Sequence, residues 1–435
     1  MIFTALPASG PLTGTVRVPG DKSISHRAVL FAAMAEGTSR LTGVLDSADV
    51  RSTLAAVTAL GAEVEVGRPH GIGLDITVTG WGVEGPRQPS SVIDCGNSGT
   101  TCRLLMGVLA PWPVTVTLDG DASLRKRPMR RVTDPLTLMG AGFTTTDGHL
   151  PVTVEGGVLR ALRYESPVAS AQVKTAVLLA GLGAEGVTTV IEPAPSRDHT
   201  ERLLPAFGVG VGCDHATNSC WVDGPEELAA RDVTVPADPS SAAFIAGAAV
   251  IVPGSDVRLR DVALNPTRTG FLRVLERMGA RTETLMEGAT GAEPTGGVEI
   301  SYASGLCGTV VHAEEVSSLV DEVPLLAVVA CAAEGVTRFE GVSELRVKES
   351  DRLSAIADGL TALGAIVRTG DDWLEVEGPA QLHGARLSSL GDHRLAMAWA
   401  VAALQADGPV EIEDWEAVDV SYPDFARDLA SLAAR

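Results

Sequence analysis

The sequence predicts an α/β protein that is assembled from six copies of one unit. Three observations lead to this prediction: a recurring helix start, a second helix that ends at a glycine or small residue, and short valine-rich runs with strand-like alternation. The helix starts are turns of small and polar residues before Ala-, Val- and Leu-rich stretches, anchored at Asp21, Asn97, Ser170, Pro239, Asp321 and Asp392. Because successive anchors lie 69 to 82 residues apart, the spacing indicates internal repeats.

The remaining elements of the unit follow from the segments between the anchors. The second helical segments are residues 53–62, 135–141, 203–208, 274–280, 360–365 and 425–430. Residues 114–118 and 187–191 alternate in the way that is typical of strands. Each unit is therefore predicted to pack two helices on a small sheet. The helix over 242–252 is apolar on nearly all sides, so we expect it to be buried.

The position of the fourth anchor predicts the domain organisation. Pro239 begins the fourth of six units, so the chain is expected to pass from one domain to the other near residues 237–240. The sixth unit has only 44 residues from Asp392 to the last residue, and residues 1–20 are expected to complete its domain. The predicted domains are residues 1–20 with 238–435, and residues 21–237.

Composition limits the partners and the location. The net charge of −21 argues against nucleic acid or an anionic membrane as a partner. Residues 1–10 lack a basic region followed by an apolar stretch, and no apolar run reaches membrane-spanning length, so a soluble cytoplasmic protein is expected. The six cysteines lack the doublets of a zinc site; Cys213, His215 and Cys220 suggest a metal only weakly against free thiols near a turn, and no metal is predicted.

The first helix start combines the groups that bind an anion. Lys22 and Ser23 stand at the predicted N-terminus, with Arg27 one turn further on, so an ammonium, a hydroxyl, a guanidinium and free amides converge there. A Ser-capped helix with solvated charges is the alternative for this motif alone. The chain has only four lysines, Lys22, Lys126, Lys174 and Lys348, so lysine is kept where a compact ammonium could matter.

Donor groups recur at the same point of the other repeats. They are Asn97 to Thr100 with Arg103, Arg125-Lys126-Arg127, Ser170-Ala171-Gln172, Arg197, Lys348 and Arg352 (expected four apart on one helical face), and Asp392-His393-Arg394. Surface ion pairing, for example of Arg197 with Asp198, explains any one of them, and a solvated charge run is the alternative for Arg125–Arg127. Their recurrence favours a site for two small anions, phosphates or carboxylates, with acid–base groups Asp321, Glu349, His393 and Lys22 beside it.

Five of these segments carry a family resemblance. Residues 21–27, 96–100, 124–129, 347–352 and 391–397 resemble the signature segments of the 5-enolpyruvylshikimate-3-phosphate (EPSP) synthase family of enolpyruvyl transferases, in the same order from Pro19 to Pro423. The resemblance implies two similar domains, each of three βαβαββ units, arranged as an inside-out α/β barrel with the active site in the cleft between them.

The resemblance also implies a reaction and its residues. Members transfer the enolpyruvyl group of phosphoenolpyruvate to the 5-hydroxyl of shikimate 3-phosphate through a tetrahedral intermediate, without metal or cofactor, and a monomer is expected. Shikimate 3-phosphate would be held by Lys22, Ser23, Arg27, Ser170, Ala171, Gln172, Arg197, Asp321 and Lys348. Phosphoenolpyruvate would be held by Lys22, Asn97, Gly99, Arg127, Gln172, Arg352 and Arg394. Asp321 and Glu349 would move protons, supported by Lys22 and His393.

The sequence departs from the family pattern at three places. Val420 stands where many members have a lysine, Ala171 where some have a second serine, and Arg197 where other branches use a tyrosine. Two alternatives stay open. A UDP-N-acetylglucosamine enolpyruvyl transferase typically carries Lys-Asn at the first motif and a loop cysteine near Arg127, whereas this chain has Ser23 and no cysteine over 103–130. A non-catalytic anion-binding protein on the same scaffold would be favoured only without Asp321 and Glu349.

Overall fold

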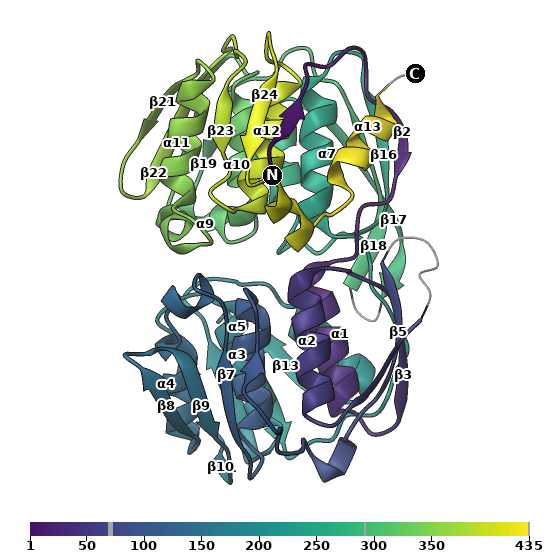
Figure 1. The fold of residues 1–435 in the computed structure, drawn as a ribbon, viewed down its shortest axis with the longest axis vertical. Helices are drawn as coiled ribbons and strands as arrows, with labels where there is room; N and C mark the ends of the chain where they lie inside the picture. The colour runs from purple at the N-terminus through teal and green to yellow at the C-terminus, as the bar shows by residue number, and fades with distance from the viewer. Residues whose placement is uncertain (68–72, 291–292, 434–435) are drawn as a thin grey trace. The chain divides into compact units, whose positions relative to one another are not determined.

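The computed structural model describes residues 1–67, 73–290 and 293–433, which divide into two compact units. Unit 1 comprises Met1–Pro19, Pro236–Gly288 and Pro294–Arg435, and unit 2 comprises Gly20–Val235 and Ala289–Glu293 (Figure 1). Along the chain the unit assignment changes after residues 19, 235, 288 and 293. The sequence-based domain boundaries, after residues 20 and 237, stay a prediction. The sequence did not predict that residues 289–293 group with unit 2.

The described residues of unit 2 form three sheets. Their strands, in spatial order, are β15 (Val233–Thr234), β3 (Thr38–Val44), β5 (Leu74–Thr79) and β4 (Glu63–Val66); β6 (Ile93–Asp94), β7 (Thr115–Asp119), β9 (His149–Glu155) and β8 (Gly142–Thr146); and β10 (Leu159–Arg160), β12 (Ala184–Ile191), β14 (Ser219–Gly224) and β13 (Val211–Asp214), with β11 (Arg163–Glu165) also on β12. In the first two sheets one short strand pairs in parallel with a longer one, and in the third both β10 and β11 pair in parallel with β12; the other pairs are antiparallel.

The described residues of unit 1 also form three sheets. Their strands are β17 (Arg281–Thr290), β18 (Glu293–Ser301), β16 (Asp256–Ala263) and β2 (Thr13–Val16); β19 (Val310–Val311), β20 (Gly335–Glu340), β22 (Trp373–Gly378) and β21 (Ile366–Thr369); and β1 (Phe3–Ala5), β24 (Val410–Glu413) and β23 (Arg386–Ser388). The first residues of the chain serve two of these sheets, because β1 pairs antiparallel with β24 and β2 pairs parallel with β16.

Helices join the strands in a repeated order. Those of unit 2 are α1 (Lys22–Met34), α2 (Ala48–Ala59), α3 (Gly99–Leu109), α4 (Arg130–Met139), α5 (Ala171–Gly181) and α6 (His199–Leu203). Those of unit 1 are α7 (Pro239–Ile251), α8 (Gly270–Arg277), α9 (Ala313–Val316), α10 (Val323–Ala330), α11 (Arg352–Ala362), α12 (His393–Ala403) and α13 (Phe425–Leu432). The run β6-α3-β7-α4-β8-β9 has the order βαβαββ, which confirms the predicted repeat.

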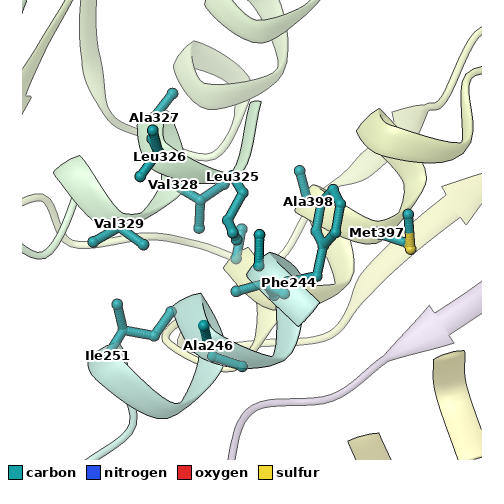
Figure 2. Close-up of a cluster of buried hydrophobic side chains, with 14 of the residues drawn as sticks. Phe244, Ala246, Ile251, Leu325, Leu326, Ala327, Val328, Val329, Met397 and Ala398 are labelled. Carbon is teal, nitrogen blue, oxygen red and sulfur yellow. The ribbon is translucent and has the colours of Figure 1, made fainter. Parts of the chain in front are cut away.

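The first helix of each repeat lies in the core. Every residue of α7 is buried, which confirms the prediction for 242–252, and α7 packs with α10 and α12 through side chains such as Phe244, Leu325 and Met397 (Figure 2). In unit 2, small residues likewise allow α3 and α5 to pack closely. A Cβ on Gly107 of α3 would lie 2.2 Å from the carbonyl oxygen of Ala176 on α5. Helices are therefore inside and sheets outside, as the inside-out barrel requires.

Polar residues cap the buried helices. The side chains of Asp21, Ser98 and Ser170 accept amide hydrogen bonds at the starts of α1, α3 and α5, and Asp238 and Asp392 do the same for α7 and α12. This is why five of the six sequence anchors lie at or next to the cap of a helix. Within residues 1–67, 73–290 and 293–433, no helix combines the length and apolarity needed to cross a membrane.

Candidate active site

The start of α1 presents the first group of predicted site residues. Lys22 is the first residue of the helix, and its ammonium forms an ion pair with Asp49 of α2. Ser23 follows it, and the backbone carbonyl of Ser23 accepts a 3.0 Å hydrogen bond from Arg27 Nη1. Asp49 is buried and was not predicted as a site residue. It compensates the charge of Lys22 and fixes the position of the ammonium.

Arg27 is a buried cation whose hydrogen bonds go to neutral groups. Nε donates to Thr200 Oγ1 at 2.7 Å and Nη2 donates to Thr175 Oγ1 at 2.9 Å, while only 2% of the residue is exposed. Burial lowers the pKa of Arg27 to about 10. A guanidinium that is desolvated and bound by hydroxyls retains charge that an anionic ligand can neutralise.

The start of α3 brings a second set of predicted residues together. Arg127 Nη2 donates to Asn97 Oδ1 at 2.7 Å, and Arg103 Nη1 donates to Gln172 Oε1 at 2.6 Å. Gly99 begins the helix beside both arginines, since a Cβ there would lie 3.3 Å from Arg103 Nη1 and 3.4 Å from Arg127 Nη1. Gln172 Nε2 also donates to Thr100 Oγ1 at 3.0 Å, so the starts of α3 and α5 meet here.

The cations of the 125–127 segment do not act as one group. Arg125 is exposed and forms an ion pair with Asp119, with 2.9 Å between Nε and Oδ1. Lys126 is exposed as well, and only Arg127 of the three hydrogen bonds to Asn97. The hypothesis of a solvated charge thus describes Arg125, and the hypothesis of a ligand group fits Arg127.

The start of α5 carries the third set. Ser170 caps the helix, and Ala171 and Gln172 are its first two residues. Arg197 lies in the segment before α6, and its neighbour Asp198 pairs with Arg202 at 2.8 Å. The pairing of Arg197 with Asp198 stays a prediction.

Buried hydroxyls connect the starts of α1 and α3. His26 Nδ1 lies 2.7 Å from Thr53 Oγ1, Thr53 Oγ1 lies 2.6 Å from Thr101 Oγ1, and Thr101 Oγ1 donates to Ser98 Oγ at 2.7 Å. Burial lowers the pKa of His26 to about 3, so the imidazole is neutral near pH 7. This series of hydrogen bonds fixes the two helix starts relative to each other inside unit 2.

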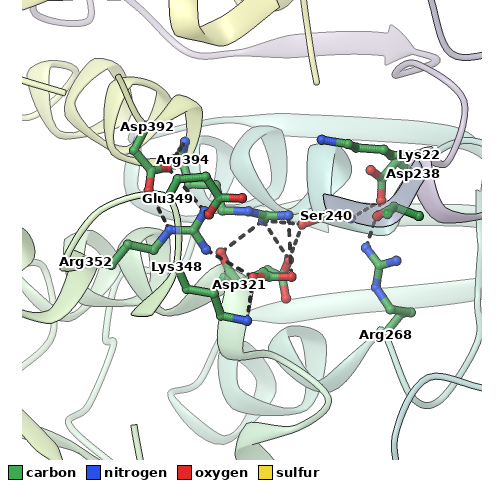
Figure 3. Close-up of polar contacts among 12 residues, drawn as sticks. Lys22, Asp238, Ser240, Arg268, Asp321, Lys348, Glu349, Arg352, Asp392 and Arg394 are labelled. Atoms are coloured by element: carbon green, nitrogen blue, oxygen red, sulfur yellow. Dashed lines mark hydrogen bonds and ion pairs between the residues drawn. The ribbon is translucent and has the colours of Figure 1, made fainter. Parts of the chain in front are cut away.

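In unit 1, Arg352 joins three acidic side chains (Figure 3). Its guanidinium donates to Asp392 Oδ2 at 2.7 Å, to Asp321 Oδ1 at 3.1 Å and to Glu349 Oε2 at 2.5 Å. Only 1% of Arg352 is exposed. Burial by itself would lower the pKa of Arg352, but the charges of Asp392, Glu349 and Asp321 outweigh burial and raise it. Arg352 therefore stays cationic and fixes both predicted proton-transfer carboxylates.

Arg394 organises the other side of this cluster. Its Nη1 donates to Ser240 Oγ at 2.5 Å, to the backbone carbonyl of Asp321 at 3.0 Å and to Glu322 Oε1 at 3.2 Å. Ser240 also hydrogen bonds to Glu322. His393, buried at the first turn of α12, precedes Arg394. Unit 1 thus gathers Asp321, Glu349, Arg352 and Arg394 around one cluster.

One sequence-based expectation about this cluster is wrong. Lys348 and Arg352 do not share a helical face, because Lys348 follows the 3-10 turn Ser343–Val347 and α11 begins only at Arg352. Lys348 Nζ instead lies 2.7 Å from Glu344 Oε1 and 3.8 Å from Asp321 Oδ1. Asp321 lies in the 3-10 turn Val320–Glu322 directly before α10 (Val323–Ala330), at the predicted helix start. The cations Lys348, Arg352 and Arg394 lie within 4 Å of its carboxylate.

The weak metal hypothesis concerned Cys213, His215 and Cys220. Cys213 and Cys220 are partners in the register of β13 and β14, and both are free thiols. Among the described residues, no three His, Cys, Asp or Glu side chains are grouped to hold a metal ion.

Comparison with solved structures identifies the class of protein. The structure is similar to an EPSP synthase from Acinetobacter baumannii with a TM-score of 0.89 and 42% identity, covering 100% of this chain and 98% of that chain. It also resembles the enolpyruvyl transferase NikO from Streptomyces tendae, with a TM-score of 0.76, 21% identity and coverage of 100% and 98%, a likeness that shows the fold alone. The fold is that of an enolpyruvyl transferase.

The sequence comparisons then give the family. Residues 6–429 match the family described as EPSP synthase (3-phosphoshikimate 1-carboxyvinyltransferase). A 3-phosphoshikimate 1-carboxyvinyltransferase of Halorhodospira halophila is 51% identical over 97% of this chain and 94% of the relative, and one of Bacillus thuringiensis is 47% identical over 99% of both. The chain belongs to the EPSP synthase family. The predicted enolpyruvyl transfer is confirmed as its activity, and these relatives do not support the alternative functions.

Proposed function

We propose that the residues gathered at the helix starts of both units carry the reaction of this family on shikimate 3-phosphate and phosphoenolpyruvate. In unit 2, Lys22, Ser23, Arg27, Ser170, Ala171, Gln172 and Arg197 would bind shikimate 3-phosphate, and Lys22, Asn97, Gly99, Arg127 and Gln172 would bind phosphoenolpyruvate. In unit 1, Asp321 and Lys348 would serve shikimate 3-phosphate, and Arg352 and Arg394 would serve phosphoenolpyruvate.

One observation carries the catalytic part of the proposal: a single buried guanidinium, that of Arg352, hydrogen bonds to both Asp321 and Glu349. The reaction needs one proton removed from the 5-hydroxyl and one delivered to the methylene carbon of phosphoenolpyruvate. Breakdown of the tetrahedral intermediate then needs a proton taken from the new methyl group. Two carboxyl groups held by one cation can share these tasks when one is ionised and accepts the hydroxyl proton while the other carries a proton and delivers it to the carbon.

We assign the roles by position. Asp321 is the base at the 5-hydroxyl. Glu349, the more exposed of the pair with 29% of its side chain accessible against 12% for Asp321, protonates the methylene carbon, and Lys22 is its rival. His393 supports proton transfer from the first turn of α12. The proposal needs neither metal nor cofactor, and it includes a monomeric enzyme in the cytoplasm.

A phosphate-release assay tests the proposal. Phosphate should appear with phosphoenolpyruvate plus shikimate 3-phosphate, at a rate unchanged by EDTA, and it should not appear when UDP-N-acetylglucosamine replaces shikimate 3-phosphate. Phosphate release with phosphoenolpyruvate plus the UDP-sugar, but not with phosphoenolpyruvate plus shikimate 3-phosphate, would overturn the substrate assignment.

Substitution of the proposed base tests the mechanism. Asp321→Asn should preserve binding of shikimate 3-phosphate while kcat falls by about 10² or more, as expected for loss of a positioned base. Glu322→Gln is the matched control, because Glu322 is adjacent and its carboxylate contacts Ser240 and Arg394. An unchanged kcat in Asp321→Asn, or a loss seen only in Glu322→Gln, would show that the base is assigned to the wrong residue.

A further inference from the structure

Glu192 is a buried carboxylate of unit 2 that follows β12 and belongs to none of the predicted binding groups. Its Oε1 accepts a 2.7 Å hydrogen bond from the backbone amide of Ser170, the cap of α5. Its Oε2 accepts from Ser196 Oγ at 2.7 Å and lies 2.8 Å from Lys174 Nζ. One side chain thus joins the cap of α5 to the segment that carries Arg197.

Lys174 strengthens this junction. It lies one turn after Ser170 on α5, and its ammonium contacts both Glu192 Oε2 and Glu201 Oε1 at 2.8 Å, with 6% of its side chain exposed. Burial would lower the pKa of Lys174, but the charges of Glu201 and Glu192 outweigh burial and raise it. The ammonium is therefore permanently charged, and Glu192 is held in place by a charge-assisted contact.

The two carboxylates on Lys174 differ in what else they hold. Glu192 contacts Ser170 at the start of α5 and Ser196 in the segment before α6. Glu201 lies on α6, and the Oε2 of Glu201 is buried without a hydrogen-bond partner among the described residues. Both are 9% exposed or less. Loss of either negative charge would therefore disturb the same ion cluster, but only loss of Glu192 would release Ser170 and Ser196.

We propose that Glu192 is a positioning residue for shikimate 3-phosphate: it fixes the Ser170 cap relative to the Ser196–Arg197 segment, so that both reach one substrate. The inference rests on the proposed function, which places Ser170 and Arg197 against that substrate. Glu192 itself would not touch the substrate. Its effect should appear in the affinity for shikimate 3-phosphate and leave the chemical step unchanged.

The test compares Glu192→Gln with the matched variant Glu201→Gln by steady-state kinetics and thermal unfolding. In Glu192→Gln, KM for shikimate 3-phosphate should rise about tenfold or more, with kcat within about threefold and KM for phosphoenolpyruvate within about twofold of the parent. In Glu201→Gln, the melting temperature should fall while KM for shikimate 3-phosphate stays within about twofold. An unchanged KM in Glu192→Gln, or an equal rise in both variants, would overturn the proposal.

A second pair of variants decides the matter should Glu192→Gln fail to fold. Ser196→Ala removes one arm of the junction and should raise KM for shikimate 3-phosphate, whereas Ser196→Thr keeps a hydroxyl and should restore it; equal values for the two would overturn the proposal. Parent enzyme and Asp321→Asn are assayed alongside. If these two behave as proposed and Glu192→Gln matches the parent, this inference alone fails; if the parent does not turn over shikimate 3-phosphate, the proposed function fails.

Discussion

Arg352 and Asp392 form a buried ion pair in which Nε donates to Oδ2 at 2.7 Å, with 1% and 0% of the two side chains exposed. The other oxygen of Asp392 accepts from the backbone amide of Arg394 at 3.0 Å and caps α12. One carboxylate thus sets both the helix start that carries His393 and Arg394 and the guanidinium that holds Asp321 and Glu349. In unit 1 the carboxylate of Asp392 therefore both caps α12 and forms the buried ion pair with Arg352.

We predict that Asp392→Asn keeps the helix cap, because asparagine is a good capping residue, but leaves Arg352 with less compensating charge. Breaking a buried pair in this way should lower the free energy of unfolding by about 3 kcal/mol and raise KM for phosphoenolpyruvate. Urea unfolding and steady-state kinetics measure the two effects. Asp238→Asn is the matched control, since Asp238 caps α7 and pairs with Arg268 at 3.0 Å. Asp238→Asn should lower the free energy of unfolding but leave KM for phosphoenolpyruvate unchanged. If Asp392→Asn were as stable as the parent, the prediction would be contradicted.

Replacement of Arg27, unlike that of Asp392, should weaken substrate binding without lowering stability. Its guanidinium is desolvated and bonded to hydroxyls, so Arg27→Met should leave the ligand-free protein as stable as the parent or more stable. Thr175 and Thr200 lie 2.6 Å apart and can satisfy each other. The affinity for shikimate 3-phosphate should fall by about 10² because a buried charged contact is lost. Arg125→Met, which removes an exposed cation, should change neither quantity. Calorimetry measures the affinity for shikimate 3-phosphate, and urea unfolding measures the stability. Full affinity in Arg27→Met would show the prediction to be wrong.

Gly99 should control the phosphoenolpyruvate pocket through the arginines beside it. The methyl group of Gly99→Ala would lie 3.3–3.4 Å from Arg103 Nη1 and Arg127 Nη1, so at least one guanidinium must shift. We expect KM for phosphoenolpyruvate to rise and inhibition by glyphosate, which occupies the phosphoenolpyruvate site in this family, to weaken by about tenfold or more. Gly157→Ala, where the added carbon meets open space, is the control. Equal inhibition of the parent and Gly99→Ala would show that Gly99 does not line this pocket.

His26 should make stability depend on pH. Burial lowers the pKa of this imidazole to about 3, whereas an unfolded histidine has a pKa near 6.5. Below pH 6.5 the unfolded chain binds a proton that the folded protein does not bind until about pH 3, so acidification favours unfolding. This single group should cost about 2 kcal/mol between pH 7 and pH 5. Urea unfolding at both pH values should show a smaller loss in His26→Asn than in the parent, while His215→Asn, at an exposed site, should match the parent. Equal losses in all three proteins would refute the prediction.

The sequence by itself determined the repeats, the helix starts and the buried helices. These features are local, because a capping side chain such as Asp21 or Ser98 bonds to amides a few residues away and an all-apolar stretch such as 242–252 has no polar face to expose. The motifs that carry the family resemblance are local as well, which is why the fold class and the activity were both predictable.

The tertiary structure decided which charges meet. Arg352 of α11 contacts Asp321 of its own repeat and Asp392 of the next one. Lys22 pairs with Asp49 of α2, Arg125 pairs with Asp119, and Arg127 donates to Asn97. Apart from the Arg125–Asp119 pair, whose residues are six apart, these contacts join residues 27 to 40 positions apart and depend on how their segments are packed. Ion-pair energies depend on distance and burial, which residue spacing does not specify. Glu192 was invisible to sequence reasoning for the same reason: its role arises only because β12, α5 and the segment before α6 converge on one carboxylate.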